Sequence, residues 1–217
     1  MSKIAVIDFE TTGLSPANGD RATEVAVVII DENRVIGSYQ SLMNAGKRIP
    51  AFVQRLTGIT DAMIRQAPPS SEVMQELAEF VGDIPFVAHN AAFDSKFIDA
   101  EWSRIHHQRS QTFACSLLLS RRLYPNFHNY KLGNLARYLN LPTAERSHRA
   151  LADAELTAKL IIQIKADLQA KYAIDQVSHE MLCLLQKAPK SRIDEVVQKA
   201  QRNLRFCNNR YDHETMK

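Results

Sequence analysis

Three apolar runs near the start of the chain limit its possible fold more than any other feature. Residues 4–10 (IAVIDFE) are short, β-branched and end in acids, which predicts a buried strand. Residues 24–44 contain two further apolar runs divided by a polar turn at 31–33, which predicts a hairpin. A hairpin joined to strands that need helical crossovers requires a mixed sheet, so we expect an α/β layered domain.

The rest of the chain alternates strands with helices and then becomes almost entirely helical. Two more strands are predicted at 84–89 and 111–116, where short apolar segments precede helical periodicity. Between the hairpin and these strands, a serine start, a nearby glutamate and a terminal Gly82 predict a capped amphipathic helix. Asn90 is expected to cap the next helix. We expect helices at 50–56, 70–82, 90–105, 116–123, 131–140, 149–170, 174–187 and 190–206.

The composition is that of a globular protein. Hydrophobic residues make up 45% and charged residues 24% of the 217 residues, which argues against global disorder. The apolar runs are far shorter than the ~18 residues that span a bilayer, and the start of the chain does not read as a secretory signal. The three cysteines are far apart, which argues against a disulfide framework or a cysteine zinc site and predicts a cytoplasmic location.

The net charge of +3 comes from the end of the chain. Basic and acidic residues balance in residues 1–170, whereas residues 171–217 contain nine basic and six acidic side chains. This excess indicates either a tail attracted to phosphates or an ordinary solvated helix face.

Asp8 and Glu10 are the first candidate functional residues. They lie two positions apart at the end of a strand, so both project from one face, and their charges repel unless a cation neutralises them. A surface strand also carries such pairs without function. The turn at 11–14 (TTGL) follows directly, and its glycine suits a close approach of substrate to the backbone.

Further acids come from two later segments. Asp94 follows a strand and lies in the first turn of a helix, where an acid also simply favours the helix dipole. Asp153 begins a long helix, and His148 lies five residues before it, on the preceding loop. Carboxylate ligands alone select Mg²⁺ or Mn²⁺, and a histidine with an ordinary pKa near 6.5 suits a general base.

Three motifs together resemble one family. DFETTGL (8–14), HNAAFD (89–94) and HRALADA (148–154) resemble, in order and spacing, the exonuclease motifs of the DEDD superfamily in its DEDDh branch. That branch includes the proofreading epsilon subunit of bacterial DNA polymerase III, RNase T and oligoribonuclease. The resemblance covers about residues 3–165. It implies an RNase H-like fold, with a five-stranded mixed sheet flanked by helices and the second strand antiparallel to the rest.

A change in composition near residues 171–173 predicts a division of the chain, with an exonuclease domain at 1–170 and a helical C-terminal extension at 171–217. The resemblance implies a set of roles for the first of these parts. Two Mg²⁺ or Mn²⁺ ions would act together, with Asp8 bridging them. Glu10 and Asp153 would complete the site that binds the attacking water, Asp94 would hold the other ion directly or through water, and His148 would take the proton.

The resemblance also implies contacts to the substrate from residues of the same motifs. The turn that contains Gly13 would close over the terminal 3′-hydroxyl through the backbone of Thr11 and Thr12. Leu14 would wedge against the last base and Phe93 would support the penultimate one, although Phe93 and Phe97 also have the spacing of core residues. His89 and Asn90 would lie near the phosphates. The sequence departs from the family at Thr57, where many members have a substrate-side histidine.

The sequence therefore predicts a metal-dependent 3′→5′ exonuclease that acts on single-stranded ends of DNA and releases 5′-mononucleotides. An RNA-trimming exonuclease shares the motifs, and a replication-accessory module that docks on a polymerase or sliding clamp is the alternative outside enzymes. An aspartyl phosphatase is excluded, because it needs a second aspartate where Glu10 stands. No membrane partner is expected.

One short segment near the end of the chain raises a separate hypothesis. Gln201, Leu204 and Phe206 have the spacing of the peptide by which bacterial replication proteins dock on the sliding clamp. The alternative is that Leu204 and Phe206 belong to the buried stripe of a last helix.

Overall fold

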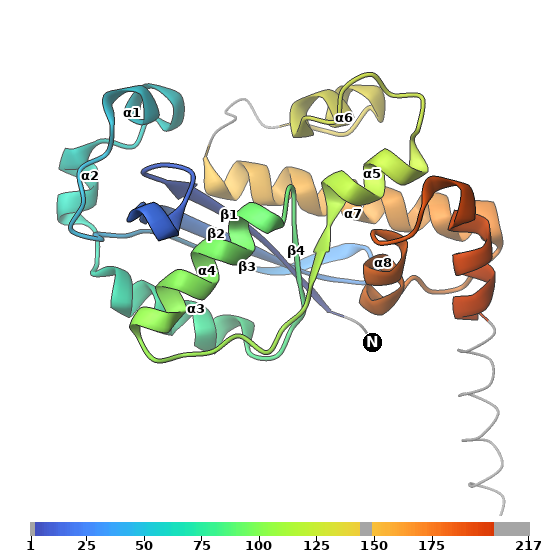
Figure 1. Ribbon diagram of the computed structural model, residues 1–217, viewed down its shortest axis with the longest axis horizontal. Coiled ribbons are helices and arrows are strands. Elements are labelled where there is room, and N and C mark those ends of the chain that lie inside the picture. Colours follow the sequence, from blue (N-terminus) through green and yellow to red (C-terminus); the bar gives the residue numbers. More distant parts are fainter. Residues whose placement is uncertain (1–2, 144–148, 202–217) are drawn as a thin grey trace, which may run out of the picture.

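The computed structural model describes residues 3–143 and 149–201, and it contains the expected mixed sheet (Figure 1). The strand order is β3-β2-β1-β4-β5. β2 is antiparallel to β1 and β3, whereas β4 is parallel to both β1 and β5. This confirms the predicted five-stranded sheet with an antiparallel second strand. The strands are β1 (Ile4–Thr11), β2 (Ala22–Asp31), β3 (Arg34–Leu42), β4 (Phe86–Ala88) and β5 (Phe113–Cys115).

Helices cover both faces of the sheet, and β1 shows why. Its side chains alternate, so Ile4 and Val6 pack with one apolar cluster that includes α7 (Ala150–Tyr172). Ala5, Ile7 and Phe9 pack with a second cluster that includes α3 (Ser70–Val81) and α4 (Ala92–Arg104). Asp8 and Glu10 continue the alternation of Ile4 and Val6 and therefore belong to the face that α7 covers.

The remaining helices surround this core. α1 (Ala51–Thr57) and α2 (Asp61–Gln66) lie at one end of the sheet and share a small core of their own (Figure 1). α5 (Ser116–Leu123) and α6 (Leu132–Tyr138) pack against α7. None of the helices in the described part of the chain is both long enough and apolar enough to cross a bilayer.

The chain after α7 adds side chains to the core on the α7 face. α8 (His179–Leu185) is shorter than expected, because Ser178 caps it by accepting a hydrogen bond from the Met181 N–H at 3.2 Å. Residues 193–201 are helical, and Val197 is fully buried in the same cluster as α7. Leu204 and Phe206 of the predicted clamp peptide lie outside the described residues.

Two predicted helix caps are wrong, for different physical reasons. Ser70 lies inside the first turn of α3 rather than before it, and its hydroxyl accepts a hydrogen bond from the Arg21 guanidinium at 3.0 Å. Asn90 has a φ of 71°, so it forms the sharp turn between β4 and α4 instead of capping α4, and Ala91 precedes the helix. Asparagine tolerates this left-handed backbone better than most residues.

Candidate active site

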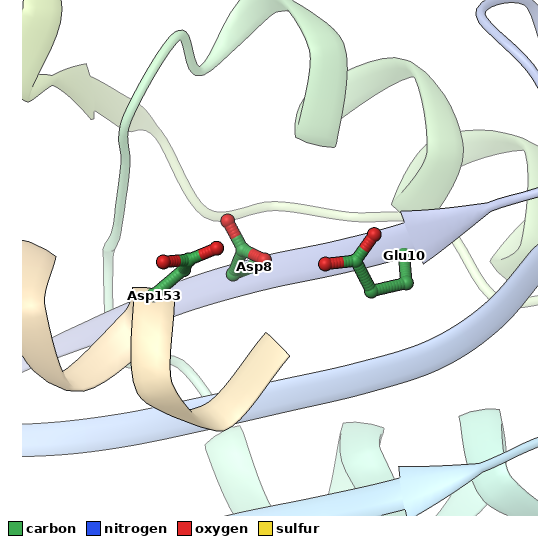
Figure 2. A group of neighbouring side chains, drawn as sticks. All are labelled: Asp8, Glu10 and Asp153. Carbon is green, nitrogen blue, oxygen red and sulfur yellow. The ribbon is translucent and has the colours of Figure 1, made fainter. Parts of the chain in front are cut away.

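Asp8, Glu10 and Asp153 bring their carboxylates together beside β1. Asp8 and Glu10 come from β1, and Asp153 comes from the first turn of α7, which covers the same face of the sheet (Figure 2). One carboxylate oxygen of each residue lies within 4.8 Å of the others, and all three side chains are half-buried. This is the grouping that the alternation along β1 predicts.

Burial and mutual repulsion make the charged forms of these acids costly. The pKa of Asp8 is well above its usual value, first because of burial and then because of the charges of Asp94, Asp153, Glu10 and Glu24. Burial, with Asp153 and Glu24, raises the pKa of Glu10 to about 7. An all-oxygen, negatively charged cluster of this kind fits a hard divalent cation such as Mg²⁺ or Mn²⁺, which would stabilise the charged forms.

Asp94 lies beside this cluster and is tied to the backbone of β1. Its Oδ1 accepts a hydrogen bond from the Phe9 N–H at 3.2 Å, and its side chain is almost fully buried. Burial raises the pKa of Asp94 to about 8, although the backbone hydrogen bonds act in the opposite direction. Asp94 does not belong to the group of three whose oxygens lie within 4.8 Å, so its role as a metal ligand stays a prediction.

Glu24, on the neighbouring strand β2, holds the start of α7 in place. The sequence analysis did not identify this role. Its carboxylate pairs with the Arg149 guanidinium, with distances of 2.7 Å from Nη2 to Oε1 and 3.1 Å from Nε to Oε2. Its Oε2 also accepts the Ala150 N–H at 3.1 Å, which replaces the side-chain cap that Arg149 itself does not provide. The available signal was a lone acid at the start of a buried apolar run (EVAVVII), because such a charge needs a partner.

The turn after β1 is built around Asp20. The Asp20 Oδ2 accepts the Ser15 N–H at 3.0 Å, and its carboxylate lies so close to Gly13 that a Cβ there would come within 2.4 Å of Oδ2. Gly13 is therefore required by packing against Asp20. Leu14, in contrast, is 83% exposed, which leaves its side chain available for a ligand.

The two threonines of this turn are inside the protein. Thr11 donates its hydroxyl to the Gly13 carbonyl at 2.6 Å, and the Thr12 N–H donates to the Arg21 carbonyl at 2.8 Å. Arg21 in turn forms a two-pronged pair with the buried Glu101, at 2.7 and 2.8 Å. This second buried pair links the turn to α4, and sequence reasoning missed it as well.

The end of β4 and the start of α4 carry three further predicted residues, His89, Asn90 and Phe93. The two ring nitrogens of His89 lie 2.8 Å from the Ser116 Oγ and 3.0 Å from the Tyr130 carbonyl, and burial lowers its pKa to about 4. Asn90 is exposed, and Phe93 is half-buried with its ring 4.9 Å from that of Phe97. Phe93 thus contacts the core and also faces solvent.

A groove of about 910 Å³ connects the acids with α5 and α6. Asp8 and Asp153 line it, as do His89 and Asn90, and its remaining lining includes the exposed side chains of Arg121, Lys131 and Arg137.

Two further predicted positions have different outcomes. Thr57, which stands where relatives have a histidine, is buried, and its hydroxyl donates to the Val53 carbonyl at 3.0 Å. It therefore supports the last turn of α1, whose C-cap is Gly58. His148 lies outside the described residues, although its neighbour Arg149 is fixed by Glu24.

Comparison with known proteins agrees with this arrangement. The family described as RNase T, Exonuclease, matches residues 5–161. The 3′-5′ exonuclease DinG of Bacillus subtilis is 36% identical over 171 residues, which cover 77% of this chain and 18% of DinG. The PolC-type DNA polymerase III of Caldanaerobacter subterraneus is 35% identical over 167 residues, covering 77% of this chain and 12% of the polymerase. The chain thus spans less than a fifth of the length of these curated relatives.

Solved structures show the same fold. Exonuclease X, in complex with 5′ overhanging duplex DNA, is similar with a TM-score of 0.63 and 26% identity over 80% of this chain and 95% of its own. Escherichia coli Exonuclease I with a dT13 oligonucleotide has a TM-score of 0.68 over 80% of this chain and 43% of its own. At 18% identity, that likeness concerns the fold alone. Because the family match spans most of the chain and includes the β1 acids and Asp153, this protein belongs to the RNase T exonuclease family, the DEDD 3′-5′ exonucleases.

Proposed function

We propose that this chain is a metal-dependent 3′→5′ exonuclease that removes 5′-mononucleotides from single-stranded DNA ends. The observation that carries the proposal is the grouping of the Asp8, Glu10 and Asp153 oxygens within 4.8 Å on one face of the sheet. The DNA-bound state of Exonuclease X, and the DNA polymerases among the curated relatives, support DNA as the substrate.

The cluster would hold two Mg²⁺ or Mn²⁺ ions, with Asp94 beside it. Bound divalent ions in such sites activate water and neutralise the charge that develops on the phosphate. The part of the protein is to keep these carboxylates together. Burial and mutual repulsion raise the pKa values of Asp8, Glu10 and Asp94, and a bound cation would relieve that repulsion. The Phe9 N–H keeps Asp94 in place, and Glu24 keeps the Asp153 end of α7 in place.

His148 would accept the proton of the attacking water. It precedes Arg149, the residue that Glu24 anchors, and its ordinary pKa near 6.5 suits a base at neutral pH. On the substrate side, Leu14 has the exposure needed to press on the terminal base, and the Thr11 and Thr12 backbone would contact the 3′-hydroxyl. Phe93 would support the next base.

A substrate comparison tests the proposal. Single-stranded DNA and RNA of the same sequence, labelled at the 5′ end, are incubated with Mg²⁺, with Mn²⁺ or with EDTA. We expect stepwise shortening of the DNA with either metal, release of 5′-mononucleotides and no reaction in EDTA. Faster shortening of the RNA would make the protein an RNA-trimming exonuclease. Undiminished activity in excess EDTA would refute the metal assignment.

A further inference from the structure

The groove beside the acids is lined by groups of opposite charge. Asp8 and Asp153 line it from β1 and α7, and Arg121, Lys131 and Arg137 line it from α5, from the loop before α6 and from α6 itself. We propose that these three cations bind the phosphates of the strand upstream of the scissile bond. This inference rests on the proposed function, and it assigns the path by which the substrate approaches the acids.

All three cations are available for a ligand. Arg121, Lys131 and Arg137 are exposed, and within residues 3–143 and 149–201 no carboxylate lies within 4.0 Å of them. Among the described residues, Arg137 donates hydrogen bonds to neutral groups of its own helix, the Gly133 carbonyl and the Asn134 side chain. Other basic residues, such as Arg109, differ in this respect, because an ion pair with a carboxylate already neutralises their charge. Exposed cations without anionic partners are suited to phosphates.

The direction of the strand follows from what lines the groove. Of the described residues that line it, none comes from the turn at 11–14 or is Glu10. The turn continues the chain from the end of β1, beyond Glu10, and Figure 1 shows this end of β1 away from α6. If the terminal nucleotide occupies the turn, the preceding nucleotides extend past Asp8 into the groove and toward α6.

His89 fixes the wall that carries Lys131. A neutral imidazole donates one hydrogen bond and accepts another, and the carbonyl of Tyr130 can only accept. His89 therefore donates from Nε2 to the Tyr130 carbonyl and accepts at Nδ1 from the Ser116 hydroxyl. This neutral ring joins the end of β4 to the residue before Lys131 and so holds this part of the groove wall in place.

The proposed contacts predict a substrate preference based on backbone charge. The three cations would contact phosphates, which carry no sequence information and are the same in DNA and RNA. The groove should therefore increase affinity for long strands of either sugar, and it should not select bases.

Binding without hydrolysis gives the first test. A 5′-fluorescein-labelled 12-nucleotide DNA strand is titrated in EDTA with the wild type and with the groove variant, in which Arg121, Lys131 and Arg137 are all replaced by Gln. A control variant carries Gln at Arg34, Lys187 and Lys199, which are exposed residues outside the groove lining. Both variants lose three positive charges.

The expected result is a change in salt dependence. Each phosphate contact on a single strand contributes about 0.7 to the slope of log affinity against log salt. The groove variant should therefore lose about 2 in slope and about tenfold or more in affinity near 0.1 M salt, and the control variant should lose much less. Equal losses in the two variants, or none in either, would overturn the proposal.

Kinetics separate failure of the groove from failure of the active site. Thymidine 5′-(p-nitrophenyl phosphate) has no upstream strand, so the groove variant should hydrolyse it at the wild-type rate with Mn²⁺. On the 12-nucleotide strand the same variant should show a KM raised about tenfold and an unchanged kcat. A wild type that hydrolyses neither substrate would refute the proposed function, and the binding measurement would still decide the groove.

Discussion

Glu10 and Glu24 lie directly opposite each other in the β1–β2 ladder, and within the described residues Glu24 is the one of the two that forms an ion pair. Glu24 is fully buried and paired with Arg149, whereas Glu10 keeps a pKa of about 7. The two glutamates of this cross-strand pair therefore have different roles. Glu24 is neutralised within the protein and anchors α7, and Glu10 is left for a ligand that brings positive charge.

Replacement of Glu24 by Gln should test this anchoring role. Gln loses the charge that holds the Arg149 guanidinium, so the free energy of unfolding should fall by about 1.5–3 kcal/mol and kcat should fall about tenfold or more. Tyr124→Phe is the control, because it removes the 2.5 Å hydrogen bond to Asp167, farther along the same helix. Denaturant unfolding and steady-state kinetics give both quantities. If both variants keep the same kcat, Glu24 does not position Asp153.

Substitution of Asp8 by Asn should stop catalysis without harming the fold. The change removes one negative charge from a crowded cluster, so the metal-free protein should be as stable as the wild type or more stable. Loss of a metal ligand should lower kcat about 10³-fold or more. Asp99→Asn, on the exposed side of α4, is the control for activity, and it should lose some stability because it breaks the ion pair with Arg109. A fully active Asp8→Asn enzyme would rule out metal binding at this residue.

The stability of the metal-free protein should fall as the pH rises. The pKa of Glu10 is about 7 and that of Asp94 about 8 in the fold, against ordinary values near 4 in the unfolded chain. Between these values the folded state holds more protons, so each unit of increasing pH favours unfolding, and the full penalty is reached above the folded pKa. Thermal unfolding in EDTA from pH 6.5 to 8.5 should show this decline. Mg²⁺ should reverse it.

Glu10→Gln provides the comparison for that titration. Gln cannot ionise, so the variant should lose less stability than the wild type between pH 6.5 and 8.5. Parallel curves for the two proteins would show that Glu10 does not titrate in this range.

His148→Ala should separate proton transfer from metal binding. Loss of a general base lowers kcat by about 10²–10⁴-fold, while Mn²⁺ affinity measured by calorimetry should stay near that of the wild type. The wild-type rate should also fall below about pH 6 as the imidazole becomes protonated, and the variant should lack this limb. A loss of Mn²⁺ affinity as large as that of Asp8→Asn would make His148 a ligand instead.

The features that the sequence predicted well depend on local periodicity and on recognisable motifs. The period-two alternation in IAVIDFE was enough to place Asp8 and Glu10 on one face, and the motif order was enough to bring Asp153 to them. The hairpin and the buried strands were predicted for the same reason. These patterns depend on residues that are close in the sequence, so no tertiary information is needed to detect them.

The features that were missed depend on partners far apart in the sequence. Glu24 and Arg149 are separated by 125 positions, and no local pattern in either segment predicts that the two residues pair. Ser70 was expected to cap the start of its helix, but the Arg21 guanidinium engages its hydroxyl instead. Asn90 was assigned to the same capping role, while the path from β4 to α4 requires a left-handed residue there.

Strand polarity tests the account most directly. One DNA oligonucleotide is prepared unblocked, with a 3′-phosphate and with a 5′ block, and each form is incubated with Mg²⁺ and either the wild type or Asp8→Asn. The account predicts that the wild type releases 5′-mononucleotides from the unblocked and 5′-blocked strands at equal rates, that the 3′-phosphate stops release, and that Asp8→Asn releases none. Release of mononucleotides from the 5′ end of the 3′-blocked strand, or equal rates for the two proteins, would contradict it.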